Sequence, residues 1–437
     1  MKIALIMVKA DIYAFINRPK IIRNTPDSLT MGMLYSIIKN AFPDIEVDIY
    51  DESVEKIKKE AITADLIGIS AMTPTFNKAI EYAQYFKKKG GVVFLGGAHA
   101  SLVPEECTQY FDSVISGLAN ESLIELINDF KNGNLKNIYY QNKQLSFENF
   151  VHPARDIYEK KSIWGTELNM VQATYGCSNV CEFCVQPHIC NGYHQRPIDD
   201  VIEEIKKIKS SEIEFFDPNL SKDINYLKKL CEELIPLKKE WFAPLTISVA
   251  NNEELLSLLK ESGCTGALIG FESISNDSIS TINKGFNQIE KYKEAIQKFH
   301  NYNIEVTGSF VIGLDGETQE SYKQLEEFIE NSNIDYPRFT INTPYPGTPY
   351  FEKMKAENRI LTTDLSKYDC QHCVIKPQKF SAEEIEKIYT QLWKKTYSLK
   401  SITKRLSYIK SPSKRFIKCI QNYLSGKVYI KYVLKKN

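Results

Sequence analysis

The stretch MVQATYGCSNVCEFCVQPHIC, residues 170–190, holds four of the ten cysteines in this chain of 437 residues. Cys177, Cys181 and Cys184 follow a short apolar run, with three and then two residues between them. Thiolates are the usual protein ligands of iron–sulfur clusters, whereas zinc sites generally use two separated pairs of ligands. Three thiolates would hold three irons of a four-iron cluster and leave one iron open. Two alternatives stay open: Cys190 as a fourth ligand that closes the cluster, and a purely structural role for the cysteines.

The same stretch begins a regular alternation of apolar runs and helical patterns. The candidate strands lie at 170–176, 213–217, 244–250, 266–273, 304–314 and 338–346, with helical patterns such as 197–209 and 319–332 between them. Six strand–helix units are too few for a complete eight-unit barrel. The sequence therefore predicts a partial (β/α)6 barrel of the TIM type over 166–350, followed by a helical C-terminal region at 351–437.

Upstream of the barrel, residues 1–135 form a second alternation. Its candidate strands lie at 2–8, 45–51, 66–71, 92–97 and 112–117, and several are continuously hydrophobic, as is typical of strands buried on both faces of a parallel sheet. This pattern predicts a doubly wound α/β domain of the Rossmann or flavodoxin type, in which ligands bind beyond the carboxyl ends of the strands. Residues 136–165 are expected to form a linker with a small hairpin.

Charge and hydropathy indicate which partners and which cellular location to expect. The formal net charge is zero, which gives no indication of a nucleic-acid partner. The N-terminus does not resemble a signal peptide, and no apolar run approaches the ~18 residues of a transmembrane helix, so a cytoplasmic protein is expected. Residues 394–437 carry thirteen Lys or Arg and no Asp or Glu. Such a basic tail can contact a membrane or RNA, although a solvated pair of terminal helices is the favoured interpretation.

The cysteine spacing after the first strand of a partial barrel resembles the signature of the radical S-adenosylmethionine (SAM) superfamily. The resemblance implies a [4Fe-4S] cluster held by Cys177, Cys181 and Cys184, with SAM chelated at the open iron. It also implies reductive cleavage of SAM to a 5′-deoxyadenosyl radical, an electron donor such as flavodoxin or ferredoxin, and anaerobic conditions. Phe183 takes the place of an aromatic residue that lies beside the SAM adenine in that family.

Further segments at the ends of the predicted barrel strands are similar to the same family. They imply SAM contacts from Asp217, Asn219, Glu272, Ser273 and Gly313. Asp217 and Asn219 are suited to accept hydrogen bonds from the SAM ammonium group, but Asp-Pro-Asn is also ordinary turn chemistry, so a turn stays open here.

The N-terminal segment resembles the cobalamin-binding domain of class B radical SAM methyltransferases. That family's Asp-x-His-x-x-Gly motif is reduced here to Asp11, since the histidine and glycine are missing, and many class B enzymes also lack the histidine. Residues 117–121 depart from the family's Gly-Glu-Gly-Glu, so a domain that has lost its ligand stays open. The implied cobalamin contacts are Ser70, Met72, Thr73, Gly96, Gly97 and Gly117.

Both cofactors on one chain imply methyl transfer from methylcobalamin to an unactivated carbon, or phosphorus, of a small-molecule or lipid-like substrate. A cobalamin-dependent radical cyclase, rearrangement or oxidative enzyme without methyl transfer is the alternative within enzymes, and a cobalamin or redox sensor is the alternative outside them. Cys370 and Cys373 form a separate Cys-x-x-Cys, for which packing or a substrate-side loop is favoured over a metal site, because a closed site usually needs four ligands.

Overall fold

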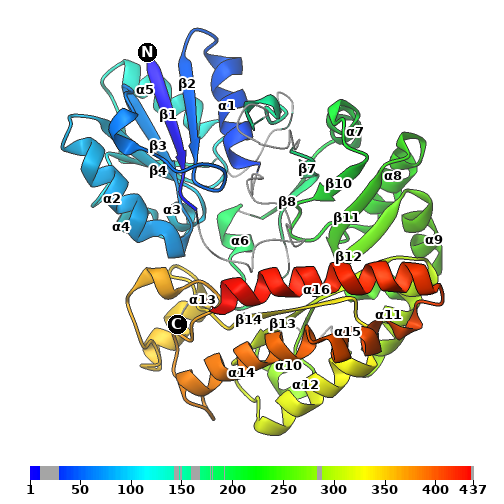
Figure 1. Cartoon of the computed structure of the whole chain (residues 1–437). Helices are drawn as coiled ribbons and strands as arrows, with labels where there is room; N and C mark the ends of the chain where they lie inside the picture. The colour runs from blue at the N-terminus through cyan, green and yellow to red at the C-terminus, as the bar shows by residue number, and fades with distance from the viewer. Residues whose placement is uncertain are drawn as a thin grey trace.

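The computed structural model describes residues 1–9, 29–141, 147, 150–158, 168–177, 179, 181–190, 192–282 and 288–434. Asp11 therefore lies outside the described residues. Two parallel sheets, each covered by helices, form the two halves of the molecule, and the C-terminal helices pack beside the second (Figure 1). Among the described residues, none of the helices combines the length and the hydrophobicity needed to cross a bilayer.

The first sheet has six parallel strands in the order β2-β1-β3-β4-β5-β6, which confirms the doubly wound domain. Separate apolar cores cover its two faces, which explains why all five residues of the third strand are buried. The strands are β1 (Lys2–Met7), β2 (Glu46–Asp51), β3 (Leu66–Ser70), β4 (Val92–Gly96), β5 (Ser113–Ser116) and β6 (Ile138–Tyr140), and the helices are α1 (Thr30–Ala41), α2 (Phe76–Lys87), α3 (Ala98–Leu102), α4 (Pro104–Cys107) and α5 (Ser122–Lys131).

The sixth strand differs from the expected linker at 136–165. β6 pairs in parallel with β5 and buries Tyr139. Three residues are too short a run to show a period, so the sequence pattern did not identify this strand.

The second sheet also has six parallel strands, in the order β14-β13-β12-β11-β10-β7, and confirms the partial barrel. Its main strands and helices alternate along the chain as expected. The strands are β7 (Met170–Val171), β10 (Glu212–Phe215), β11 (Glu240–Leu245), β12 (Cys264–Glu272), β13 (Glu305–Ile312) and β14 (Tyr336–Ile341), and the helices are α7 (Ile198–Lys207), α8 (Ile224–Leu234), α9 (Glu253–Glu261), α10 (Asn276–Thr281), α11 (Tyr292–Asn301) and α12 (Gln319–Asn331).

Two predicted strands are wrong in detail. The strand expected at 170–176 splits after β7, and β8 (Thr174–Gly176) leaves the barrel sheet to pair antiparallel with β9 (Tyr193–Gln195). The strand expected at 244–250 lies earlier in the chain: β11 pairs with β10 from Glu240 and with β12 from Trp241, and it ends at Leu245. Residues 247–251 form a 3₁₀ turn instead. As a result, the cysteine-bearing loop follows a strand of the separate two-stranded sheet rather than a strand of the barrel sheet.

The C-terminal region is helical, as predicted. Trp393, Tyr397 and Tyr429 join the apolar core of the barrel, which ties the last helices to the barrel. The Arg405 guanidinium is buried and donates to the carbonyls of Ile334 and Asp335. The helices are α13 (Pro349–Ala356), α14 (Ala382–Thr396), α15 (Leu399–Arg405) and α16 (Pro412–Leu434).

The two halves meet at the carboxyl ends of the first sheet. The Gln141 amide donates to the Cys190 carbonyl at 3.3 Å, and the Tyr158 hydroxyl donates to Asp51 at 2.8 Å. Gly347 lies so close to Leu102 that an added Cβ would come within 2.2 Å of the Leu102 carbonyl oxygen. Hence the end of the first sheet at which ligands bind in this fold faces the cysteine-bearing segment.

Candidate functional site

The cysteine loop begins at a glycine that no other residue could replace. Gly176 has a φ of +71°, and a Cβ there would lie 1.8 Å from the Gly192 carbonyl oxygen. Within the loop the Cys184 amide donates to the Cys181 carbonyl at 3.0 Å, and the Asn179 amide donates to the Cys177 sulfur at 3.4 Å. The loop ends at the short helix α6 (Gln186–Ile189), which packs against α3 of the first domain.

The three cysteines form a donor set that fits an iron–sulfur cluster with one open iron. Cys177 is buried, whereas Cys181 and Cys184 are partly exposed. Burial, with smaller contributions from the nearby Cys181, Cys177 and Glu272, raises the pKa of the Cys184 thiol to about 12. In the described part of the chain, no group of three or more Cys, His, Asp or Glu side chains is already arranged around a metal-sized point. Bound iron would therefore draw the thiolates together, and it would favour their deprotonated form.

Glu272 stands at the end of β12, next to this loop. Its backbone has a φ of +63°, in the left-handed region that costs a non-glycine residue about 1–3 kcal/mol. The pairing of β12 with β13 is irregular at the same point, and the Ser273 amide donates to the Phe271 carbonyl at 2.8 Å. Glu272 is among the charged groups that raise the pKa of Cys184, so its carboxylate faces the cysteine loop.

Phe183, within the cysteine loop, packs against residues at the end of β13 and on α13. It contacts an apolar cluster that includes Val311 and Leu314, and a second cluster around Tyr350 and Met354. The aromatic ring is therefore held at the same end of the barrel as the cysteines.

Asp217 and Asn219 make hydrogen bonds to the chain itself. Asp217, which is buried at the end of β10, accepts hydrogen bonds from the Thr174 amide at 2.5 Å, the Thr174 hydroxyl at 2.7 Å and the Ala173 amide at 3.3 Å. Burial raises its pKa to about 7, against the opposite effect of these hydrogen bonds. Asn219 accepts from the amide and the hydroxyl of Ser221, which is turn geometry. Asp217 therefore holds the strand that leads into the cysteine loop.

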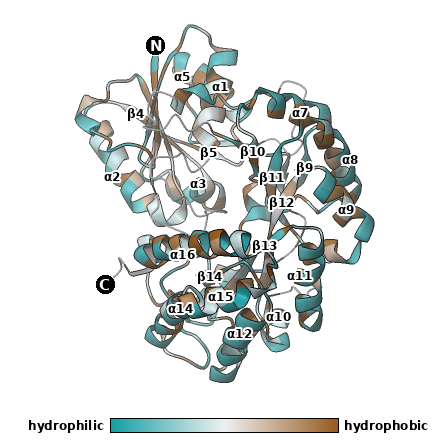
Figure 2. Cartoon of the chain, turned by 45° about the vertical axis from the view of Figure 1, so that its right-hand side comes forward, coloured by the Kyte–Doolittle hydropathy of each residue, from teal (hydrophilic) through white to brown (hydrophobic). Residues whose placement is uncertain are grey.

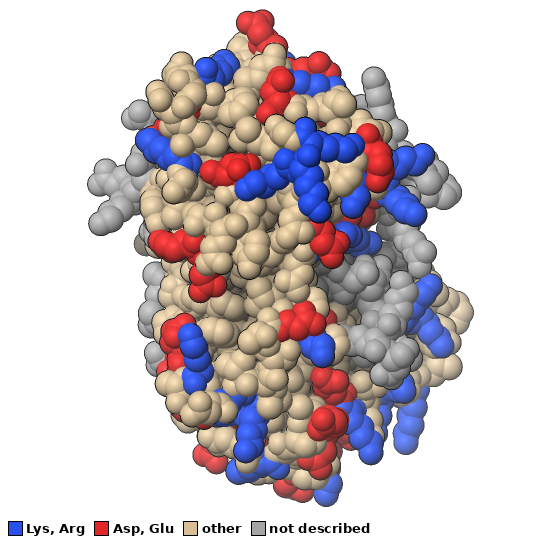
Figure 3. Space-filling view, turned by 90° about the vertical axis from the view of Figure 1, so that its left-hand side faces the viewer, with Lys and Arg blue, Asp and Glu red and all other residues tan. Residues whose placement is uncertain are grey.

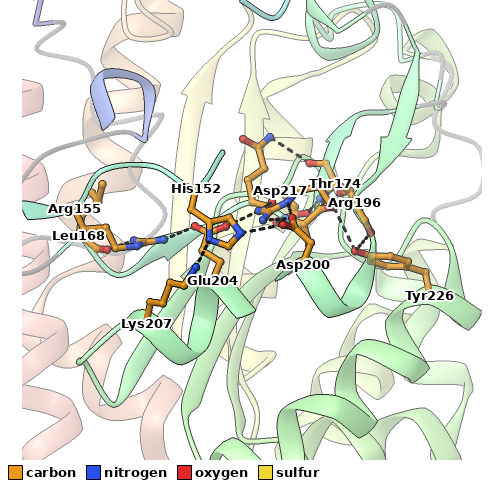
Figure 4. A network of polar contacts seen from close by, with 12 residues as sticks. His152, Arg155, Leu168, Thr174, Arg196, Asp200, Glu204, Lys207, Asp217 and Tyr226 are labelled. Carbon is orange, nitrogen blue, oxygen red and sulfur yellow. Dashed lines mark hydrogen bonds and ion pairs between the residues drawn. The ribbon is translucent and has the colours of Figure 1, made fainter. Parts of the chain in front are cut away.

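A buried ionic network that the sequence analysis missed supports the same strand (Figure 4). Arg196 donates to the Gln172 carbonyl at 2.8 Å and to Glu204 at 2.6 Å, and its two remaining nitrogens reach Asp200. Arg155 bonds Glu204 from the other side. Asp200 and Glu204 are four residues apart on α7, a spacing that by itself indicates only a charged helix face.

Gly313 lies in a tight turn after β13. With a φ of +86°, its amide donates to Glu317 at 2.8 Å and to the Tyr322 hydroxyl at 3.1 Å. Glu317 also accepts from Leu314, and burial raises its pKa to about 7. The turn positions the carbonyl of Gly313, which accepts from the Asn342 amide at 3.4 Å.

A cavity lies at the carboxyl ends of the first sheet, with an empty space of about 1100 Å³ including the part open to solvent. Four of the residues expected to contact cobalamin line it: Ser70, Gly96, Gly97 and Gly117. Met72 and Thr73 are not part of this lining, and the Thr73 hydroxyl bonds His99 at 3.1 Å instead. Barrel residues that the sequence analysis did not single out close the cavity, namely Gln172, Tyr175, Ile189 and Phe216.

The glycines of the cavity make room for a large ligand. A Cβ at Gly96 would meet no atom within 4 Å, so this position opens into empty space. Gly97 and Gly117 have φ values of +98° and +91°, which only glycine adopts readily. Because most of the lining is apolar, the residues present fit a large, mostly apolar organic group with a few polar anchors.

Cys370 and Cys373 make contacts of ordinary packing. The Cys373 thiol is buried and donates to the Ile375 carbonyl at 3.3 Å. The Cys370 sulfur lies 3.0 Å from the Tyr345 hydroxyl. These contacts agree with the favoured interpretation of the motif.

Comparison with known proteins defines the class. The family described as the radical SAM superfamily matches residues 171–329, and the B12 binding domain matches residues 29–127. The bacteriochlorophyllide d C-12(1)-methyltransferase of Chlorobaculum tepidum is 29% identical over 357 residues, which span 78% of this chain and 76% of the relative. The C-8(2)-methyltransferase of the same organism is 28% identical over 400 residues, 87% of each chain. The structure of TsrM from Kitasatospora setae with cobalamin and [4Fe-4S] cluster bound has a TM-score of 0.69 at 13% identity, covering 98% of this chain and 99% of that one.

The cavity of the B12-binding domain is lined in part by Tyr175 and Ile189, on either side of the three cysteines of the radical SAM domain. The chain contains a radical SAM domain and a B12-binding domain, as cobalamin-dependent radical SAM enzymes do, and its cofactors are a [4Fe-4S] cluster, SAM and cobalamin. Methylation is the reaction that its relatives support best.

Proposed function

We propose that the protein methylates an unactivated carbon, or phosphorus, of a small-molecule or lipid-like substrate. Cys177, Cys181 and Cys184 hold the cluster, and the cavity at the end of the first sheet holds cobalamin. The observation that carries this proposal is the position of Gln172 and Tyr175. Both line the cavity, and Tyr175 precedes Cys177 by two residues, so the two cofactors would meet at one interface between the domains.

When bound, the cluster and SAM supply the radical that activates the substrate, and cobalamin supplies the methyl group. The residues of the chain would position the cluster, SAM and cobalamin relative to one another. Glu272 and Ser273 offer acceptors beside the cysteine loop for the polar end of SAM, and Phe183 offers an apolar surface for its adenine. Asp217 and Arg196 hold the strand between the cavity and the loop, so that a shift of one site would displace the other.

The same proposal covers the surroundings of the reaction. A low-potential donor such as flavodoxin or ferredoxin supplies the electron that cleaves SAM, and the oxygen-poor cytoplasm protects the cluster. Two bacteriochlorophyllide methyltransferases are similar to this chain over most of its length, and this similarity supports a largely apolar substrate for this chain.

The test is the metal, cofactor and product content of anaerobically reconstituted protein. We expect iron, sulfide and cobalamin in the wild type, and loss of iron alone in a Cys177→Ala/Cys181→Ala/Cys184→Ala variant. Cys419→Ala is the matched control, because that cysteine lies on α16 in the C-terminal region. With a methyl acceptor present, turnover yields both S-adenosylhomocysteine and 5′-deoxyadenosine. Iron without cobalamin, even when cobalamin is supplied, would remove the methyl-transfer step from the proposal.

A further inference from the structure

The last helix, α16, exposes large apolar side chains to solvent. Phe416 is 67% exposed, Ile417 55%, Ile420 44% and Leu424 43%. These are four of the ten large apolar residues that are exposed in the described part of the chain, and they lie within nine positions of one another. Hydrophobic residues gathered in this way generally mark an interaction site.

The helix is fixed so that these side chains point outward. Asn422, Ser425 and Tyr429 form its buried side. Gly426 packs against the Tyr397 ring, where a Cβ would lie 2.4 Å from the nearest ring carbon. At 3.6 residues per turn, positions 416, 420 and 424 share one face, and Lys427 and Lys431 continue the same face toward the C-terminus. Figure 2 shows α16 at the surface with hydrophobic residues along it.

The charged side chains of α16 itself are all of one sign. Lys414, Lys427 and Lys431 are exposed, and residues 394–437 contain no Asp or Glu. Across the face shown in Figure 3, by contrast, acidic and basic side chains lie interspersed. An exposed apolar row with cations at both ends is the pattern of a helix that lies in the plane of an anionic bilayer surface.

We propose that α16 binds the surface of a membrane that contains anionic lipids. Phe416, Ile420 and Leu424 would enter the interface between head groups and acyl chains, and the lysines would contact lipid phosphates. RNA would contact the lysines but would leave the apolar row exposed to solvent. A second copy of the chain would bring a second set of lysines into the same contact, and the like charges would repel.

The N-terminal part of α16, which carries the apolar row, lies away from the candidate active site. Lys418 of α16 pairs with Glu305, the first residue of β13, whereas Gly313 and the cysteine loop lie at the opposite end of that strand. The inference stands apart from the proposed reaction, because neither the cofactors nor the residues assigned to them take part in it.

The experiment is co-sedimentation of the reconstituted full-length protein with vesicles. We expect binding to phosphatidylcholine vesicles that contain phosphatidylglycerol, weaker binding to phosphatidylcholine alone, and loss of binding at high salt. Lys427→Gln/Lys431→Gln is expected to weaken the partition coefficient about five-fold for each lysine. Phe416→Ser/Ile420→Ser is expected to weaken it by at least about ten-fold. Leu361→Ser, which removes an exposed leucine elsewhere, is the matched control and should bind as the wild type does.

Unchanged iron and cobalamin contents in each variant separate this surface from the active site. The proposal is overturned if the wild type stays in the supernatant with anionic vesicles, or if the α16 variants bind as well as the control. It is also overturned if RNA binds and vesicles do not, or if Phe416→Ser/Ile420→Ser converts a dimer to a monomer in sedimentation velocity runs without changing vesicle binding.

Discussion

The two sheets of this protein prepare their carboxyl ends in different ways. At the end of the first sheet, glycines leave space: Gly96 opens into the cavity, and Gly97 permits a backbone turn that no side chain tolerates well. At the end of the barrel, buried polar groups take up space and hold the backbone, as Asp217 holds Thr174 and as Glu317 holds Gly313. The first end is shaped to receive a large ligand, and the second is shaped to keep a loop in place.

A polar residue near a binding site can have one of two roles, and the two sheets illustrate the difference. A carboxylate at the end of a strand can contact a cofactor, or it can satisfy the backbone amides of the loop that does so. In the barrel, Asp217 and Glu317 accept hydrogen bonds from backbone amides, while Glu272 has strained backbone geometry and faces Cys184. The following predictions test each side of the comparison, from the largest expected effect to the smallest.

Gly96→Leu should fill the cavity of the first domain without straining its backbone. The new side chain would project into space that is open in the wild type, and overlap with a bound ligand is expected to weaken cobalamin binding by about 100-fold. Methyl transfer should be lost, while iron content and uncoupled cleavage of SAM persist. Cobalamin absorbance after gel filtration and iron analysis check this. Retention of cobalamin at the wild-type level would show that the ligand lies elsewhere.

Arg196→Met should destabilise the barrel domain. It leaves Glu204 and Asp200 without their main cation, and removing one partner of a buried ionic network costs about 3–5 kcal/mol. We expect a lower melting temperature and poorer reconstitution of iron, because the strand at Gln172 loses its anchor. Lys323→Gln, at an exposed ion pair on α12 outside this network, is the control and should melt like the wild type. Equal melting of Arg196→Met and the control would contradict the structural role of the network.

The sequence predicted the two sheets and the cysteine loop well, but it did not predict the hydrogen bonds that hold them in place. Hydrophobic runs and helical spacing identified both sheets, because burial imposes those patterns on the residues themselves. The cysteine spacing identified the loop, because ligands for one cluster must lie close together. The contacts of Arg196 with Gln172 and of Asp217 with Thr174 join residues far apart in sequence, so no local pattern encodes them. For the same reason, the contribution of Tyr175 to the cavity became visible only in the folded chain.

Glu317→Gln should change how stability depends on pH. Burial raises the pKa of Glu317 to about 7 in the folded chain, whereas the same group in the unfolded chain titrates near its ordinary value of 4.5. Between these values folding takes up a proton, so the wild type loses stability as the pH rises through this window, by up to about 3 kcal/mol.

A glutamine at this position stays neutral, and its carbonyl oxygen can accept the three hydrogen bonds that now converge on one carboxylate oxygen of Glu317. The variant should therefore melt at a temperature similar to that of the wild type at pH 5 and at a higher temperature at pH 7.5. A difference that does not change with pH would mean that Glu317 is already ionised in the folded chain throughout this range.

Thr73→Val has the smallest expected effect and tests the assignment of the first domain residue by residue. The family resemblance implies that Thr73 contacts cobalamin, but its buried hydroxyl bonds His99 and is not part of the cavity lining. Burial lowers the pKa of His99 to about 4, so the ring is neutral and loses one hydrogen bond in the variant, at a cost of about 1 kcal/mol. We expect a slightly lower melting temperature and a cobalamin affinity within about two-fold of the wild type. If affinity falls more than ten-fold while the melting temperature holds, Thr73 reaches the cofactor, and the first sheet then binds it with a polar side chain as well as with the space that its glycines leave.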